Sequence, residues 1–454
     1  MEELHVWDDG ARHIGVFHRN ASGHIGFEYD ADRMQPISLS LPRAGGWLKR
    51  APSVFLENLL PDQQKVRQVM ARQTGAASTD TFDLLDRGDV TGGFTFTRSS
   101  LPPDPEDMPA RVASDSQIAA QIIQMQDNPV NWWDTTVPTR FSLAGNQAKF
   151  SLLRMGGSWF RSDMLHPSTH ILKPATGDEN MVEDASMRLA SYTGVPVPHT
   201  EILEFEGVSA YMVERFDRMR DGSGMVHRVH TEDLLQAMSL PPSEKYRVTV
   251  RQVMRLLQGA DESNTLAYEW VQRLAVNVSL NNADAHAKNY SLLYNRNGVR
   301  LSPLYDVLTT TYWPYVSRQM PLAPGGVSGA ANVTPGSWRK LAVEFGLDAD
   351  RVELLARNTA WLVLEHAEQA YRELPPHVRD RLFHELELAN KRIEPLRPIQ
   401  TADRGTAGRD APVLQSSPIA GNTDVDHMGQ VYVHGHYRRG KWVDSYWRDA
   451  PRRG

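Results

Sequence analysis

The chain of 454 residues contains no cysteine. This absence excludes disulfide bonds, zinc sites built from thiolates and iron–sulfur clusters. Long hydrophobic runs are also missing, because the apolar stretches are far shorter than the ~20 residues that a membrane-spanning helix needs. The first residues, MEELHVWDDGARHIG, are acidic and lack the basic start and apolar core of a signal peptide. Together these absences predict a cytoplasmic protein that does not enter a membrane.

The chain also has fewer basic than acidic residues. Lys and Arg number 49 against 55 Asp and Glu, which gives a formal net charge of −6. Free-standing, non-specific DNA binding needs a basic face, so this balance argues against it while allowing a local basic patch. The length and composition predict a globular protein with a large core and roughly two to four domains.

The first half of the chain predicts two structured segments and a linker. Residues 1–97 contain an opening strand pair and Leu- and Pro-rich stretches, which indicate a small α/β subdomain. Residues 98–115, RSSLPPDPEDMPARVASD, have the Ser, Pro and Asp content of a linker. Residues 116–240 predict mainly strands, with one helix from about residue 180 to residue 193 that ends at Gly194.

The second half is predominantly helical. Thr231, followed by Glu and Asp, is expected to cap the first helix, and helices occupy most of residues 241–395 apart from one hairpin. Strands first and helices second predict an α+β chain with the two lobes of a protein kinase. Residues 396–427, rich in Pro, Gly, Ser, Thr and Asp, predict a flexible linker. Residues 428–454 are basic and aromatic and predict a small β-hairpin, either solvated or able to bind RNA, DNA or an acidic surface.

The motif DAHAKN, which begins at Asp284 and ends at Asn289, carries the clearest chemical signal. A helix is predicted before it over residues 266–282, and two strands joined at Asn297-Gly298 are predicted after it. Asp306 follows the second strand. Protein kinases arrange their phosphoryl-transfer residues in this way. We expect Asp284 to orient the acceptor hydroxyl, and Asn289 and Asp306 to bind Mg²⁺, although Asp284 alone could be a turn residue.

Other residues could complete a nucleotide site. Lys173 closes an apolar strand and is a candidate phosphate ligand, and Glu183 on the following helix could pair with it. The alternatives are a solvated strand end and an exposed helix glutamate. His286 and Lys288, within the motif, could donate to a phosphate of ATP or could hold the loop through its backbone. A metal site built on Asp284, His286 and Asp306 would suit a phosphohydrolase instead.

Two further segments could contact ATP. FSLAGNQAK, residues 141–149, contains Ser142 and a single glycine, Gly145, so it matches neither a Walker loop nor a three-glycine kinase loop. Its small residues and backbone amides could still cradle phosphate. VERFDR places Glu214 and Phe216 where a hinge would offer backbone hydrogen bonds and an aromatic edge to adenine. An ordinary strand end is the alternative.

The order of these motifs resembles the HipA family of serine/threonine kinase toxins from bacterial type II toxin–antitoxin modules. The resemblance covers most of residues 3–395. It rests on a series of segments in the order of the family, namely SLSLP, FLENLLPD, FDLL, FSLAGNQAK, THILKP, VERFDR, LPPSEKY, DAHAKN and LYD. It implies a kinase fold with an added N-terminal subdomain, with ATP and Mg²⁺ as co-substrates and transfer to serine or threonine of a protein. Family members phosphorylate aminoacyl-tRNA synthetases and arrest growth, and their usual partner is a HipB-like helix-turn-helix antitoxin that binds operator DNA.

The resemblance also implies roles for single residues. By position, Lys173 is the ATP-binding lysine, Asp284 the catalytic aspartate, and Asn289 and Asp306 the magnesium ligands. Ser142 falls where the family has a serine that is autophosphorylated, a change that expels the loop from the site because the added dianion repels the phosphates of ATP. The loop departs from the family pattern, since it reads Gly-Asn-Gln-Ala-Lys. A co-repressor that acts by binding an antitoxin, and a small-molecule or lipid kinase, are the alternatives for the whole chain.

Overall fold

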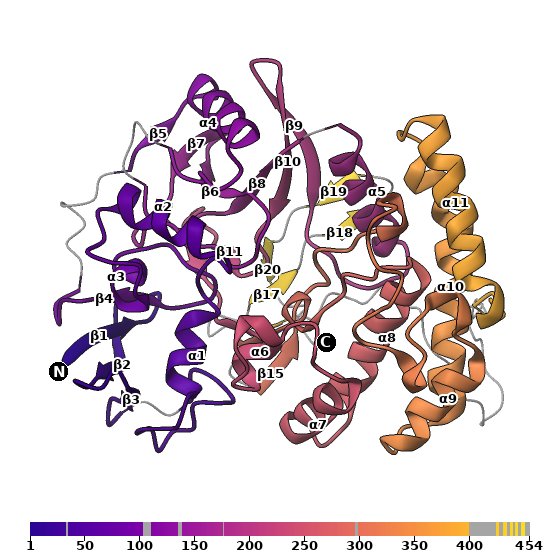
Figure 1. Ribbon diagram of the computed structural model, residues 1–454, viewed down its shortest axis with the longest axis horizontal. Coiled ribbons are helices and arrows are strands. Elements are labelled where there is room, and N and C mark those ends of the chain that lie inside the picture. Colours follow the sequence, from indigo (N-terminus) through magenta and orange to yellow (C-terminus); the bar gives the residue numbers. More distant parts are fainter. Residues whose placement is uncertain are drawn as a thin grey trace.

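The computed structural model has the mixed α+β architecture that the sequence predicts (Figure 1). In this view the N-terminal region lies to the left, a six-stranded sheet lies at the top, and α10 and α11 lie to the right. The structure describes residues 1–32, 35–102, 110–134, 139–175, 177–295 and 298–398, and the backbone of five short strands between residues 424 and 449.

The N-terminal region is a four-stranded antiparallel sheet with three helices. The strands are β1 (Glu2–Trp7), β2 (His13–Arg19), β3 (Ile25–Tyr29) and β4 (Thr95–Thr97), in the order β3-β2-β1-β4. The helices are α1 (Ala51–Glu57), α2 (Gln64–Thr74) and α3 (Thr81–Leu85). Phe17, Phe55 and Phe82 fill the space between the sheet and the helices. The same hydrophobic core continues into the next sheet through Trp133 and Phe150, so the two regions fold against each other.

The second sheet has six strands in the order β5-β7-β6-β8-β10-β9. They are β5 (Val112–Ala113), β6 (Phe150–Met155), β7 (Ser158–Arg161), β8 (His170–Pro174), β9 (Thr200–Phe205) and β10 (Val208–Glu214). The turn between β6 and β7 uses Gly156 and Gly157, both with positive φ, as the Gly-Gly pair predicts. Helix α5 (Glu179–Ser191) follows β8 and agrees with the predicted helix that ends before Gly194.

Besides α5, this part of the chain contains a long helix that was not predicted. Helix α4 (Asp115–Asp127) begins with a capping box between Ser114 and Gln117, and it buries Ile118 and Ile122. Strand β5 lies inside the segment expected to be a linker and pairs with β7. Residues 103–109 of that segment lie outside the described residues.

The prediction that Thr231 caps a helix is wrong. Thr231 opens strand β13 (Thr231–Asp233), which pairs with β14 (Ser291–Asn295), and Asp233 caps the short helix α6 (Leu234–Ala237) instead. Two further strands, β11 (Arg218–Arg220) and β12 (Val226–Arg228), form a hairpin ahead of it. Strand β14 also pairs with β15 (Gly298–Leu301), as the predicted hairpin requires, while Asn297 lies outside the described residues.

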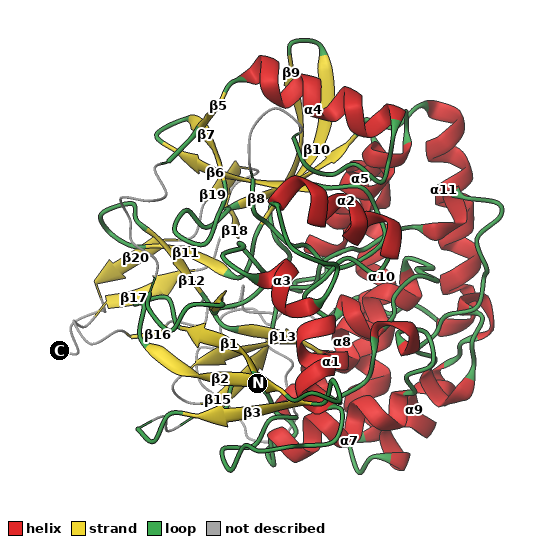
Figure 2. Cartoon of the chain, turned by 60° about the vertical axis from the view of Figure 1, so that its left-hand side comes forward, coloured by secondary structure: helices red, strands yellow, loops and turns green. Residues whose placement is uncertain are grey.

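The remaining helices form the second hydrophobic core. They are α7 (Val250–Ala260), α8 (Thr265–Ser279), α9 (Pro335–Glu344), α10 (Ala349–Tyr371) and α11 (Pro376–Asn390). Figure 2 shows most of the helices on one side of the molecule and most of the strands on the other. Short 3₁₀ turns connect them at Pro242–Glu244, Ala287–Asn289, Thr310–Tyr312, Pro324–Gly326, Ala330–Asn332 and Lys391–Ile393. Trp270, Trp338 and Tyr371 are fully buried among these helices.

The C-terminal segment contains strands as well. They are β16 (Asp424–Val425), β17 (Gln430–Val433), β18 (His436–Arg438), β19 (Lys441–Val443) and β20 (Tyr446–Asp449). Strand β18 pairs with β19, and β17 pairs with both β16 and β20. Most of the segment predicted to be a flexible linker, residues 396–427, lies outside the described residues.

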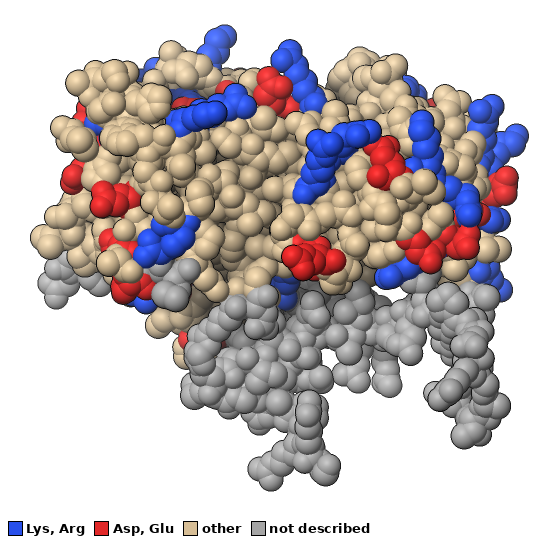
Figure 3. Space-filling model, turned by 90° about the horizontal axis from the view of Figure 1, so that it is seen from below, with Lys and Arg blue, Asp and Glu red and all other residues tan. Residues whose placement is uncertain are grey.

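The described helices include none that is both long enough and apolar enough to cross a lipid bilayer. On the face shown in Figure 3, acidic and basic side chains of the described residues are interspersed rather than gathered by sign.

Candidate active site

The loop that contains Asp284 and Asn289 joins α8 to β14. Trp270 and Leu274 anchor α8 in the helical core, so the point at which the loop begins is fixed. Asn282 Oδ1 accepts a hydrogen bond from the backbone N–H of Asp284 at 3.1 Å, and the 3₁₀ turn Ala287–Asn289 closes the loop. The β14–β15 hairpin then returns the chain to Asp306. The φ of Asp306 is +58°, a left-handed conformation that Asp adopts more readily than most residues.

Three charged side chains from distant parts of the chain meet beside this loop. Lys173 lies on β8, Glu183 on α5, and Asp306 after β15. Lys173 Nζ donates to Glu183 Oε1 at 2.5 Å and lies 3.4 Å from Asp306 Oδ1. Burial would lower the pKa of Lys173, but the two carboxylates outweigh burial and raise that pKa. Lys173 is therefore a permanent positive charge, paired with the glutamate that the sequence suggested.

Asp306 is the most accessible member of this cluster. Its side chain is 37% exposed, against 8% for Lys173 and 6% for Glu183. Burial would raise the pKa of Asp306, but the positive charges of Lys173 and Lys149 hold the pKa below its usual value. Asp306 therefore presents an ionised carboxylate at neutral pH.

Asp284 and Asn289 are linked within their loop. Asn289 Nδ2 donates to the backbone carbonyl of Asp284 at 3.1 Å. The side chain of Asp284 accepts a hydrogen bond from the hydroxyl of Tyr246, with 2.5 Å between Oδ1 and Oη. Burial raises the pKa of Asp284, and the negative charge of Asp306 adds to this effect. This loop and Asp306 thus act on each other electrostatically.

The donor set fits a magnesium ion. The hydrogen bond of Asn289 uses its amide nitrogen and leaves the amide oxygen for a cation, and Asp306 supplies a carboxylate. Mg²⁺ typically takes one or two protein carboxylates and completes its shell from phosphates and water. Across the described residues, no three His, Cys, Asp or Glu side chains are grouped to hold a metal. The geometry therefore gives no support to a metal site made of Asp284, His286 and Asp306.

The segment of residues 141–149 lies against the N-terminal region. Ser142 is fully buried, its Oγ donates to the carbonyl of Leu59 at 2.7 Å, and its N–H donates to the carbonyl of Asp89 at 2.8 Å. The carbonyl of Gly145 accepts a hydrogen bond from the N–H of Asp62 at 3.2 Å. The candidate phosphate loop is thus held in a closed position by backbone contacts with the first 90 residues.

Lys149 ends this segment and points back into the loop. Its Nζ lies 2.9 Å from the position that a Cβ on Gly145 would occupy, and Gly145 has a φ of +103°. The backbone conformation therefore favours glycine here, and a Cβ would also displace the end of the Lys149 side chain. Burial lowers the pKa of Lys149 to about 8, and the positive charge of Lys173 contributes to the shift. Two lysines thus face the same region, where a polyanion would stabilise both.

The predicted hinge lies at the end of β10. The backbone N–H of Glu214 donates to the carbonyl of His199 at 2.9 Å, and that of Arg215 donates to the carbonyl of Thr169 at 2.9 Å. Phe216 stacks on Tyr305, with ring centroids 5.0 Å apart. Because Tyr305 directly precedes Asp306, the stack connects the hinge to the site.

A buried charge network lies beneath the hinge and joins it to the N-terminal region. Asp89 is paired with Arg218 at 2.9 Å, with Arg228 at 3.2 Å and with Arg215 at 3.7 Å. Arg215 also pairs with Asp217 at 2.8 Å. Burial would raise the pKa of Asp89, but the arginines outweigh burial and lower that pKa. The network fixes the hinge to a residue from the N-terminal region.

The structure corrects the prediction that Lys288 binds ATP. Its ammonium group donates to Asp233 Oδ2 at 2.7 Å, to Asn58 Oδ1 at 2.7 Å and to the carbonyl of Asn58 at 3.3 Å. A lysine has three N–H donors, so all of them are used. Lys288 therefore holds the loop to α6 and to the N-terminal region, which was the alternative reading.

His286 is buried against the ring of Tyr246, with centroids 4.9 Å apart in an edge-on arrangement. Burial lowers the pKa of His286 to about 4, and the charge of Lys245 adds to the shift. The imidazole is therefore neutral at pH 7. It has a single N–H to donate to a phosphate and offers no positive charge.

The sequence prediction gave no role to four residues of the site, namely Asp62, Lys149, Lys245 and Tyr246. Lys149 ends a segment that we singled out for Ser142 and Gly145. Lys245 and Tyr246 lie in LPPSEKY, where the lysine pairs with Asp62 at 3.0 Å. Lys245 and Tyr246 act through contacts with residues far away in sequence, Asp62 and Asp284, so no local spacing reveals their roles.

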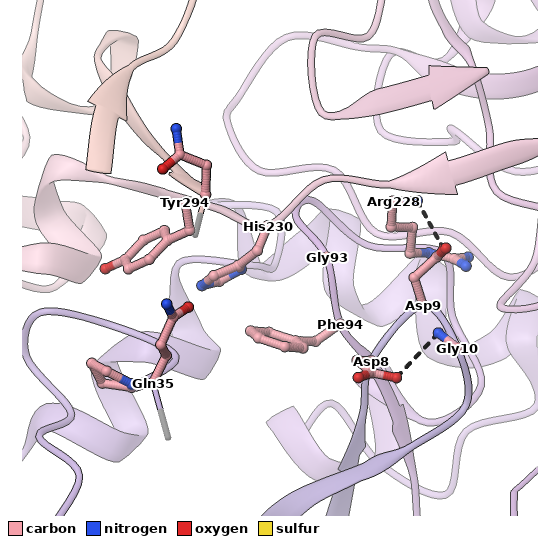
Figure 4. A pocket seen from close by; sticks show the side chains of 11 residues that line it. Asp8, Asp9, Gly10, Gln35, Gly93, Phe94, Arg228, His230 and Tyr294 are labelled. Atoms are coloured by element: carbon pink, nitrogen blue, oxygen red, sulfur yellow. Dashed lines mark hydrogen bonds between the residues drawn. The ribbon is translucent and has the colours of Figure 1, made fainter. Parts of the chain in front are cut away.

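A cavity of about 420 Å³ lies elsewhere in the molecule (Figure 4). It lies between the N-terminal region and strands β12 and β14, and Asp9, Phe94, Arg228, His230 and Tyr294 are among the residues around it. None of the predicted site residues lines this cavity.

Comparisons with known proteins identify the family. The HipA-like C-terminal domain matches residues 141–367, and the HipA N-terminal domain matches residues 4–91. A protein of Sinorhizobium fredii named "Putative kinase Y4mE" is 34% identical over 405 residues, which are 82% of this chain and 91% of that protein. The serine/threonine-protein kinase toxin HipA of Shewanella oneidensis is 28% identical over 312 residues, 63% of this chain and 70% of that protein.

A solved structure shows the same fold. It is HipA of Shewanella oneidensis in complex with HipB and its operator DNA, and it aligns with a TM-score of 0.73 at 23% identity, covering 87% of this chain and 98% of that chain. The two family matches together cover residues 4–91 of the N-terminal region and every residue of the site described above. This chain therefore belongs to the HipA family of kinases.

Proposed function

We propose that this chain is a serine/threonine protein kinase that acts as the toxin of a toxin–antitoxin pair in the cytoplasm. The observation that carries the proposal is that Lys173 Nζ lies within 3.4 Å of a carboxylate oxygen of both Glu183 and Asp306, next to the loop of Asp284 and Asn289. These five residues come from a strand, a helix and two loops. Protein kinases use the same types of residue in the same chain order.

Each residue of the site has one task in this proposal. Lys173 and Lys149 bind phosphates of ATP, and Glu183 keeps Lys173 in place. Asp284 accepts the hydrogen bond of the acceptor hydroxyl and aligns its oxygen with the γ-phosphate. Glu214 and Phe216 border the adenine, and His286 stays neutral beside the phosphates. Asn289 and Asp306 would hold Mg²⁺, which when bound neutralises charge that develops on the phosphates.

We assign the regions accordingly. Residues 1–97 form the N-terminal subdomain, residues 116–240 the small lobe, to which β5 adds an edge strand, and residues 241–395 the helical lobe. We further propose that Ser142 is autophosphorylated and that a HipB-like helix-turn-helix antitoxin restrains the kinase. The Shewanella oneidensis HipA was solved with HipB and operator DNA, which supports such a partner here, and through it an indirect contact with DNA. Family precedent makes an aminoacyl-tRNA synthetase the first acceptor to test.

The test is transfer of label from γ-labelled ATP in the presence of Mg²⁺. Asp306→Ala should abolish transfer to protein while the melting temperature stays close to that of the wild type. Asp350→Ala is the matched control, because the Asp350 side chain is 87% exposed. Equal transfer by wild type and Asp306→Ala would refute the assignment of the site.

A further inference from the structure

Tyr246 holds the position at Asp284 that an acceptor would need. Its Oη lies 2.5 Å from Asp284 Oδ1. Burial and the neighbouring carboxylates raise the pKa of Tyr246, so the phenol keeps its proton and is the donor in this bond. A serine or threonine that is about to be phosphorylated makes the same bond to the catalytic aspartate of a kinase. Among the described side chains, the Asp284 carboxylate thus accepts its hydrogen bond from Tyr246.

The backbone beneath Tyr246 is fixed from two sides. The carbonyl of Lys245 accepts a hydrogen bond from the N–H of Ala287 at 3.2 Å, inside the loop of Asp284. Lys245 Nζ pairs with Asp62 at 3.0 Å, and both side chains are only 11% exposed. The Cα of Tyr246 is therefore tied to the catalytic loop and to the N-terminal region.

The side chain of Tyr246 is much less constrained than its backbone. Tyr246 is 51% exposed, and its ring touches the edge of His286. A rotation about its side-chain bonds would free Asp284 without any change in the fold. The hydrogen bond from Tyr246 to Asp284 and the one from an acceptor hydroxyl to Asp284 are of the same kind. Replacing the first by the second therefore costs little net free energy.

We propose that Tyr246 is an internal stand-in for the acceptor, which caps Asp284 in the resting kinase and is displaced by the substrate hydroxyl. This inference rests on the proposed function, because it assumes that Asp284 receives the acceptor. Tyr246 thereby sets a threshold for acceptors, since a hydroxyl must be presented well enough to compete with an intramolecular one. It also keeps water away from Asp284 and limits wasteful hydrolysis of ATP.

The test compares Tyr246→Phe, which keeps the ring on His286 and removes the hydroxyl, with wild type. The acceptor probe is the synthetic peptide RFSLAGNQAK, the sequence of residues 140–149, whose single hydroxyl is that of Ser142. Removing one hydrogen bond of ordinary strength should lower the KM for the peptide by about three- to tenfold, with kcat within about twofold. ATP hydrolysis without peptide should rise by a similar factor, and the KM for ATP should not change. Tyr315→Phe, at a tyrosine that is 80% exposed, is the matched control and should behave as wild type.

Several results would overturn this inference while leaving the kinase assignment intact. An unchanged or higher KM for the peptide, or a fall in ATP hydrolysis in Tyr246→Phe, would show that the hydroxyl supports Asp284 rather than competing with the acceptor. Phosphate found on Tyr246 by mass spectrometry would make it a true acceptor instead of a stand-in. If the wild type neither phosphorylates protein or peptide nor hydrolyses ATP, and so matches Asp306→Ala, the proposed function fails and this inference fails with it.

Discussion

Lys149 carries a charge that changes near neutral pH. Burial lowers its pKa to about 8, so the ammonium form is lost as the pH rises above that value. We expect the KM for ATP to rise between pH 7 and pH 9 because a phosphate ligand is being discharged. In Lys149→Arg the rise should be much smaller, because a guanidinium stays protonated throughout this range. Steady-state kinetics at fixed Mg²⁺ measure both, and parallel curves would refute a role for the charge of Lys149.

A substitution at Gly145 tests whether the conformation of the same loop matters for ATP binding. A Cβ at this position would lie 2.9 Å from Lys149 Nζ, on a backbone with a φ of +103°. Gly145→Ala should therefore displace the lysine and weaken ATP binding by about tenfold or more, because the loss of a hydrogen bond from a charged group costs ~1.5–3 kcal/mol. Titration calorimetry with a non-hydrolysable nucleotide measures the change.

Gly156→Ala is the control for backbone strain alone. Gly156 also has a positive φ, of +54°, but nothing lies within 4 Å of its added Cβ. The Gly156→Ala variant should lose some stability and keep its affinity for the nucleotide. Equal losses of affinity in the two variants would mean that the contact with Lys149 is irrelevant.

The hinge depends on a single buried carboxylate from the N-terminal region. Asp89→Asn removes the negative charge that Arg215, Arg218 and Arg228 share. Breaking a buried ion pair from one side costs about 3–5 kcal/mol. Arg215 and Arg218 would keep Asp217 as a partner, whereas Arg228 would lose the carboxylate that it pairs with. We expect a loss of that order in the free energy of unfolding, measured by urea titration.

The exposed pair of Asp350 and Arg339 provides the comparison. Asp350→Asn should change the free energy of unfolding by less than about 1 kcal/mol, as surface ion pairs do. If Asp89→Asn were equally mild, the network would not hold the hinge.

The strands and helices that the sequence predicted correctly have strong local signals. The Gly156-Gly157 turn, the hairpin after Asn289 and the helix before Asp284 each follow from turn residues or from periodicity. Thr231 was assigned wrongly because its own propensity for a cap is outweighed by pairing with Leu293, a residue 62 positions later. Helix α4 was missed although Ser114 and Gln117 form a capping box, since Ser114 fell in the predicted linker and the residues after 115 fell in a region predicted to be mainly strands.

The sequence predicted only some of the residues of the candidate site. Asp284, Asn289 and Asp306 lie within one short stretch, and Lys173 and Glu183 lie within another, so spacing alone suggested them. Asp62 and Lys245 are 183 positions apart and meet only in the folded chain. Nothing in the neighbourhood of either residue indicates this contact.

The closed position of residues 141–149 links the site to the whole N-terminal region. Ser142→Asp would place a charge in a fully buried position beside the carbonyl of Leu59, where it cannot be solvated. We expect the segment to leave this position, with faster amide exchange over residues 141–149 and loss of ATP binding. Ser142→Ala loses only one hydrogen bond, of about 1 kcal/mol, and should keep both properties. Slow exchange and intact ATP binding in Ser142→Asp would show that the segment tolerates the charge.

The Asp89 network bears on how this family can be recombined. Two matched domains meet in the chain, yet the carboxylate belongs to the N-terminal one and its three arginines to the other. A chimera that joined the first domain of this chain to the second domain of a relative lacking these arginines would have an unmatched charge in its interior. The two domains are therefore separate in sequence but cannot be exchanged independently. A successful exchange must transfer Asp89 and the three arginines together.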